Sequence, residues 1–75
     1  MDNDLDIKVT PLVEDLFYLL LSLDGKVSQD QGRKIYERIK SKHTRQEYEE
    51  AIDSAKQMID NIQKYGYACN EWKNL

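Results

Sequence analysis

The side chains best suited to chemistry in this sequence are one cysteine and one histidine. Cys69 and His43 could form a nucleophile–base pair, in which the imidazole accepts the proton of the thiol. A lone cysteine in a tail and a lone histidine just before a helix start are more often structural. One thiol and one imidazole also cannot build a closed zinc site within one chain. We therefore expect no catalysis, no metal and no other cofactor.

Residues 24–28 (DGKVS) superficially resemble the start of a calcium-binding loop. Such a loop places oxygen ligands at alternating positions and closes with a bidentate glutamate. The segment lacks both the alternating acids and the closing glutamate, and the sequence contains no glycine-rich phosphate loop. Neither motif therefore changes the expectation that the protein is not an enzyme.

Positive charge is concentrated in residues 33–45 of an otherwise acidic chain. The net charge is −3, and residues 1–15 and 46–60 each hold five acids and one lysine. Between them, Glu37 is accompanied by six basic residues: Arg33, Lys34, Arg38, Lys40, Lys42 and Arg45. This asymmetry is the most informative charge feature of the chain.

Helical spacing places Lys34, Arg38 and Lys42 on one stripe, with Tyr36 among these bases as an aromatic anchor. A solvated helix face explains the stripe without any ligand. The alternatives are contact with nucleic-acid phosphates or with an acidic protein surface. Because the flanking segments are acidic and would repel a polyanion, we favour the protein surface over nucleic acid.

Residues 16–23 (LFYLLLSL) are apolar or aromatic at seven of eight positions, so apolar side chains surround the whole predicted helix. Such a helix must be covered on all sides. Either the N-terminal segment and Trp72 cover it, or Tyr18, Leu19 and Leu21 form an interface with another chain. We lean toward the interface, and expect a homodimer through this helix.

Local signals divide the chain into three helices with ordered ends. Residues 4–10 alternate between apolar and polar, which suggests a short N-terminal strand. A cap at Thr10 and Pro11 in the first turn predict a helix that runs to about Asp24, before Gly25.

Two capping boxes predict the starts of the next helices. Ser28 with Gln31 opens a helix that ends near Lys42, in which a glycine at position 32 weakens the middle or allows close packing. Thr44 with Glu47 opens a longer helix that ends at a glycine. Its apolar stripe follows helical spacing: Tyr48, Ile52, Ala55, Ile59 and Ile62.

The predicted fold class is mainly α, a small three-helix bundle with the short N-terminal strand as an additional element. A chain of 75 residues has room for one domain. It consists of an extended segment (1–10), three helices (11–65) and an ordered tail (66–75). One cysteine, no recognisable signal sequence and no transmembrane stretch indicate a cytoplasmic protein that does not enter a membrane.

Residues 19–39 (LLLSLDGKVSQDQGRKIYERI) resemble the helix–turn–helix of tellurite-resistance TerB-type helical domains. Those domains place an apolar helix, Asp-Gly, a β-branched residue, a cap and a second helix in that order. The sequence departs from the pattern at Leu23, where alanine is usual, and early in the second helix, where an acidic residue is replaced or shifted. We assign no family from this resemblance and transfer no site residue.

The function predicted from these features is that of a small non-enzymatic interaction protein, an inhibitor, antitoxin-like binder or adaptor that occupies a partner's surface. The alternative is a nucleic-acid-associated regulator that uses residues 33–45. The predicted partner-binding residues lie on the first two helices: Tyr18, Leu19, Leu21, Lys34, Tyr36, Arg38 and Lys42.

Overall fold

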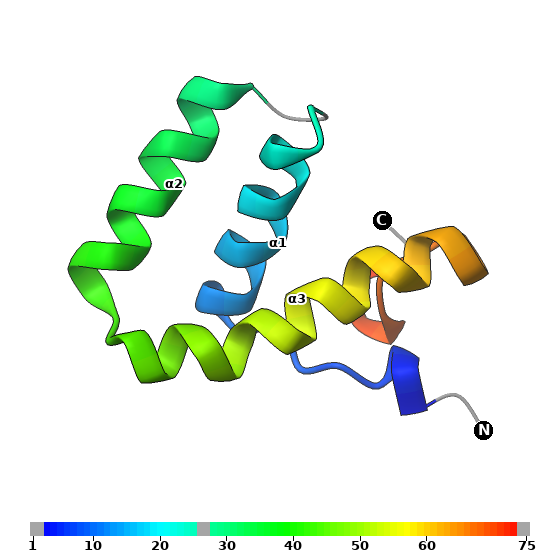
Figure 1. The fold of residues 1–75 in the computed structure, drawn as a ribbon. Helices are drawn as coiled ribbons and strands as arrows, with labels where there is room; N and C mark the ends of the chain where they lie inside the picture. The colour runs from blue at the N-terminus through cyan, green and yellow to red at the C-terminus, as the bar shows by residue number, and fades with distance from the viewer. Residues whose placement is uncertain (1–2, 26–27, 74–75) are drawn as a thin grey trace.

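The computed structural model describes residues 3–25 and 28–73, and within them it contains three α-helices. The elements follow one another as η1 (Asn3–Leu5), α1 (Pro11–Leu23), α2 (Gln29–Lys42), α3 (Arg45–Tyr65) and η2 (Asn70–Trp72) (Figure 1). The predicted mainly α, three-helix fold class is confirmed. Lys26 and Val27 of the predicted turn and positions 1–2 and 74–75 of the predicted ends lie outside the described residues.

The helices begin at the predicted caps. Thr10 Oγ1 accepts a hydrogen bond from the Val13 N–H at 3.2 Å, and Ser28 Oγ accepts from the Gln31 N–H at 3.3 Å. At α3 the capping box is reciprocal: Thr44 Oγ1 accepts from the Glu47 N–H, and Glu47 accepts from the Thr44 N–H. Each bond satisfies a backbone donor that has no partner within the helix.

The α3 helix ends at Gly66, which adopts φ 89° and donates its N–H to the Ile62 carbonyl. A side chain is strained at this positive φ, so glycine is the favoured residue there. The predicted end of the third helix is therefore confirmed.

The α1 helix is central, because α2 and α3 each pack against it and pack much less against each other. Figure 1 shows α2 and α3 diverging from the turn that joins them, with α1 behind. All three helices contribute to the core, with Leu16 and Phe17 from α1, Ile39 from α2, and Ala55 and Met58 from α3. This arrangement buries one side of each outer helix and leaves a gap between them.

Two contacts fix α2 against α1. A Cβ built on Gly32 would lie 2.7 Å from Ser22 Cβ, so the helices approach closely only because this residue is glycine. Of the two predicted reasons for glycine at position 32, close packing of the helices is the one that the structure supports. Nearer the other end of the pair, Arg38 Nη2 donates to Asp15 Oδ1 at 2.6 Å.

The predicted N-terminal strand is wrong, because no strand occurs in the described residues 3–25 and 28–73. Leu5 is buried, and η1 contacts α3 rather than another extended segment. The backbone here binds side chains instead of a β-ladder: the Asp4 carbonyl accepts from Asn61, and the Val9 N–H donates to Glu71. The alternating pattern thus reflects packing against a helical core.

The tail after α3 turns back onto α1. The Trp72 ring contacts Phe17 edge-on, with centroids 5.3 Å apart, and lies 6.4 Å from the Tyr18 ring. The tail therefore covers part of α1, which was one of the two alternatives left open by the sequence.

Candidate functional site

Two adjoining hollows lie between the diverging helices and form one surface feature, which we call the α2–α3 groove. One has a volume of about 560 Å³ and the other about 440 Å³, and both are lined by Tyr36 and Tyr48. We define the groove by seven of the residues that line it: Leu19 and Leu23 of α1, Arg33, Tyr36 and Lys40 of α2, and Arg45 and Tyr48 of α3.

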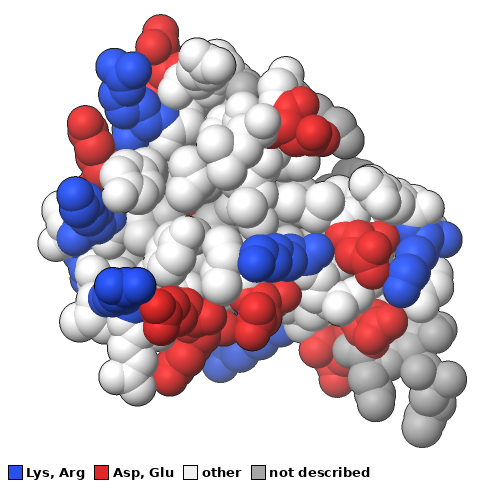
Figure 2. Space-filling view, viewed as in Figure 1, with Lys and Arg blue, Asp and Glu red and all other residues white. Residues whose placement is uncertain are grey.

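The groove is lined by apolar and aromatic side chains that are partly or largely exposed. Leu19 and Tyr48 are half-buried, whereas Tyr36 is 47% exposed and Leu23 is 78% exposed. Figure 2 shows a broad region of uncharged side chains on this face, bordered by charged side chains. An apolar surface with a polar border is typical of a protein-binding site.

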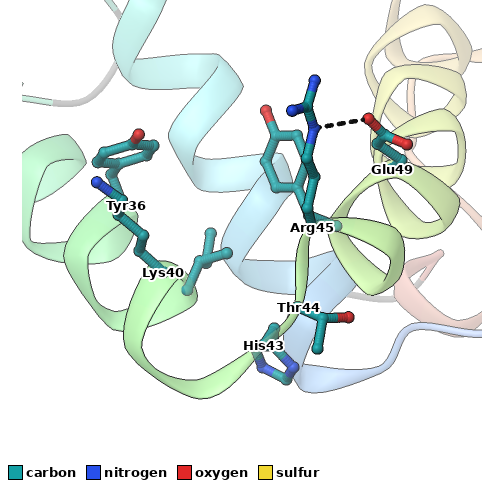
Figure 3. A pocket seen from close by; sticks show the side chains of 8 residues that line it. Tyr36, Lys40, His43, Thr44, Arg45 and Glu49 are labelled. Atoms are coloured by element: carbon teal, nitrogen blue, oxygen red, sulfur yellow. Dashed lines mark hydrogen bonds and ion pairs between the residues drawn. The ribbon is translucent and has the colours of Figure 1, made fainter.

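The border of the groove is mainly basic. Lys40 Nζ lies over the Tyr36 ring, 5.7 Å from its centroid, in cation–π geometry. On the opposite side, Arg45 Nε donates to Glu49 Oε1 at 3.1 Å. In Figure 3 these two pairs face each other across the groove, with His43 and Thr44 at the turn that closes one end.

Of the seven predicted binding residues, Leu19 and Tyr36 line the groove. Leu21 lies two positions after Leu19, about 200° around α1, and so belongs to the opposite side of that helix. Tyr18 also lies away from the groove, where its ring packs beside Trp72. The three predicted residues of the first helix therefore do not form one surface.

The predicted basic stripe of α2 points away from the groove. Lys34 and Lys42 are exposed on the outer side of the helix. Arg38 donates from Nε and Nη2 to the two carboxylate oxygens of Asp15. These hydrogen bonds, together with the negative charge of Asp15, raise the pKa of the Arg38 guanidinium. Arg38 thus joins α2 to α1 in the structure.

Sequence reasoning missed five of the defining residues of the groove: Leu23, Arg33, Lys40, Arg45 and Tyr48. A signal for two of them was present, since Arg33, Tyr36 and Lys40 are spaced i, i+3 and i+7 on one helical stripe. The stripe at Lys34, Arg38 and Lys42 has an equally regular spacing. Only the packing of α2 on α1 decides which stripe faces the groove.

The remaining chemical candidates do not assemble into a site. Cys69 is fully buried beyond the C-terminal end of α3, whereas His43 precedes its N-terminal end. A helix of 21 residues is about 30 Å long, so this thiol and imidazole are too far apart to form a nucleophile–base pair. Among the described residues, no group of three or more His, Cys, Asp or Glu side chains is placed to hold a metal ion.

No described helix combines the length and apolar character needed to cross a membrane. No family model, curated protein or solved structure matches the chain. The resemblance of residues 19–39 to TerB-type domains therefore stands without a family match. The geometry and charge of the α2–α3 groove are thus the basis for a functional proposal.

Proposed function

We propose that this chain is a non-enzymatic protein-interaction module of the cytoplasm, and that its α2–α3 groove binds a partner protein. The observation that carries the proposal is the apolar groove itself, in which Leu23 is 78% exposed and Tyr36 is 47% exposed. Burial of apolar surface contributes about 25 cal/mol per Å², so covering these side chains would favour binding. Aromatic and Arg residues, as at Tyr36 and Arg45, are also enriched among binding hot spots.

The dispersion of the basic residues supports a protein partner over nucleic acid. A phosphate backbone is neutralised by a continuous set of accessible cations. Here Arg38 pairs with Asp15 on one side of α2, whereas Lys40 stacks on Tyr36 on another side. Arg45 is already paired with Glu49. Lys34 and Lys42 are exposed outside the groove that Arg33 and Lys40 line, so the cations of α2 are divided between separate faces.

Site-specific photo-crosslinking in the native host tests this proposal. A photo-crosslinking amino acid replaces Leu23 in the groove or, as a matched control, Glu50 on the opposite side of α3. We expect position 23 to capture a protein that position 50 does not capture. The additional substitution Tyr36→Ala should reduce the capture, because it removes the most exposed aromatic side chain of the groove.

Two results would count against the proposal. Equal capture at positions 23 and 50 would show that the groove is not a preferred contact surface. Capture of RNA or DNA rather than protein at position 23 would instead favour the nucleic-acid-associated regulator. Circular dichroism of each variant establishes that the helices are retained.

A further inference from the structure

We infer that the groove's occupant is an acidic amphipathic helix of the partner protein, which lies along α2 as a fourth helix of the bundle. This inference rests on the proposed function and adds the secondary structure and charge of the bound segment. It is carried by the length of the groove, its apolar floor and the spacing of its cations.

The groove has the dimensions of a helix-binding site. Along α2 its lining runs from Gln29 to His43, which at 1.5 Å per residue is about 20 Å, or four helical turns. His43 and Thr44 lie at one end of this lining, and Leu23 and Gln29 lie at the other. Helices that bind such grooves insert apolar residues spaced i, i+3, i+4 and i+7.

The floor offers contacts for such an apolar face. Leu19 and Leu23 of α1 are one helical turn apart, and Tyr36 and Tyr48 stand on the two walls. The outer helices α2 and α3 already pack their most buried sides against α1. A fourth helix would cover the remaining apolar surface, as the last member of a four-helix bundle does.

The positive charges that line the groove would be complemented by acidic residues on the partner helix. Its lining includes three cations, Arg33, Lys40 and Arg45, against one carboxylate, Glu49, in a chain whose net charge is −3. Glu49 is paired with Arg45. Among the described residues that line the groove, no carboxylate therefore opposes Arg33 or Lys40. Complementary carboxylates on a partner would steer association and fix its register.

The spacing of these two cations specifies a pattern. Arg33 and Lys40 are seven residues apart on one side of α2, about 10 Å along its axis. Two carboxylates seven residues apart on a partner helix match this separation. The stacking of Lys40 on Tyr36 restricts the lysine before binding, so less conformational freedom is lost when the complex forms.

The same charges disfavour a second copy of this chain as the occupant. Two copies placed groove to groove would bring Arg33 and Lys40 of each near the cations of the other, and like charges in an interface oppose association. Self-association, if it occurs, should therefore use another face.

A displayed library tests the inference. Phage present 18-residue peptides with leucine fixed at helical spacing and all other positions random. Selection uses the wild-type protein, the groove variant Arg33→Glu with Lys40→Glu, and the control variant Lys34→Glu with Lys42→Glu. The two variants change the net charge equally, but only the first changes the groove.

We expect peptides with Asp or Glu seven positions apart to be enriched on the wild type and on the control variant. On the groove variant, Lys or Arg should replace these acids. A synthetic peptide of the enriched sequence should bind the groove variant about tenfold or more weakly, because two attractions become repulsions. Fluorescence anisotropy measures both affinities, with random duplex DNA as a competitor.

The inference would be overturned if no helical peptides were enriched, or if the same peptides were enriched on all three proteins. Stronger binding of duplex DNA than of every peptide, lost in the groove variant, would also overturn it. If the photo-crosslink at position 23 still captures a protein, then only the nature of the bound segment is wrong. If that capture fails as well, then the proposed function falls with it.

Discussion

A single amide group joins three separate parts of the chain. Asn61 is fully buried, and its Nδ2 donates at 2.7 Å to both the Asp4 and the Ala68 carbonyls. Its Oδ1 accepts from Gln57 at 2.9 Å. The side chain therefore uses both its donors and its acceptor, and it links the N-terminal segment and the tail to α3.

Removing this amide should destabilise the protein strongly. Asn61→Ala leaves two carbonyls without their donor, and an unsatisfied buried group costs about 1–3 kcal/mol. We expect the free energy of unfolding to fall by about 3 kcal/mol. Urea unfolding followed by the fluorescence of Trp72, the single tryptophan, measures the change. The control, Asn70→Ala at an exposed position, should change it little, and equal effects would contradict the argument.

At the start of α3, one carboxylate makes stability depend on pH. The hydrogen bond from the Thr44 backbone, followed by that of His43, lowers the pKa of Glu47 below its ordinary value of 4.5. A lowered pKa stabilises the folded state above pH 4.5, and this contribution is lost as the pH falls through the folded-state pKa.

Replacing this carboxylate should therefore flatten the acid side of the stability profile. We expect Glu47→Gln to lose less stability than the wild type between neutral pH and the range below 4.5. Thermal melts across this pH range test the difference. Glu37→Gln, on the exposed side of α2, is the control and should follow the wild type. Parallel profiles for Glu47→Gln and wild type would contradict the assignment.

At the scale of the helices, the packing of α2 on α1 depends on the close approach of Gly32 to Ser22. Alanine is favoured over glycine within a helix by about 1 kcal/mol, so Gly32→Ala should stabilise an isolated α2. In the protein its Cβ would lie 2.7 Å from Ser22 Cβ, which cannot rotate away. Overpacking of this kind costs about 1–3 kcal/mol. We therefore expect Gly32→Ala to lower the midpoint of urea unfolding.

A second substitution tests whether the contact with Ser22 is the reason that Gly32→Ala destabilises the protein. Ser22→Gly removes the atoms that the new Cβ would meet, so combining it with Gly32→Ala should relieve the clash. The double-mutant cycle should show a favourable coupling of about 1 kcal/mol or more. Purely additive effects would mean that the two positions do not interact.

The elements also show what the sequence could predict. Thr10, Ser28, Thr44 and Gly66 act within a few residues of their own positions, so the helix limits follow from local pattern. The alternation at residues 4–10 was misleading because an extended segment on a helical core needs the same apolar spacing as a half-buried strand. The groove was only partly predictable, because the packing of the helices decides that Leu23 is exposed and that Arg33 and Lys40 lie on the side of α2 that lines the groove.

For the whole molecule, the predicted homodimer stays a prediction, and the structure restricts where it can form. Leu19 lies in the basic groove, whereas Leu21 and the 38% exposed Tyr18 lie on other sides of α1. We expect any dimer to use the face that contains Leu21. Leu21→Glu should then halve the mass in solution, and Leu19→Glu should leave it unchanged.

Size exclusion with light scattering over a range of concentrations decides this point. A single-subunit mass for the wild type at every concentration would rule out the dimer. Dissociation by Leu19→Glu alone would place the interface in the groove and would contradict the expected charge repulsion. Circular dichroism is needed for both variants, because each places a charge on a half-buried helix position.

The linkage made by Asn61 also has a consequence for biosynthesis. The contact between Asn61 and Asp4 spans 57 positions in the sequence, and that between Val9 and Glu71 spans 62. Residues 4–9 are therefore synthesised well before Asn61 and Glu71. During translation α1 and α2 can pack against each other early, because their contacts are close in sequence. The N-terminal segment cannot make its own contacts at that stage. Its apolar residues are therefore exposed to chaperones until α3 and the tail beyond it have been synthesised.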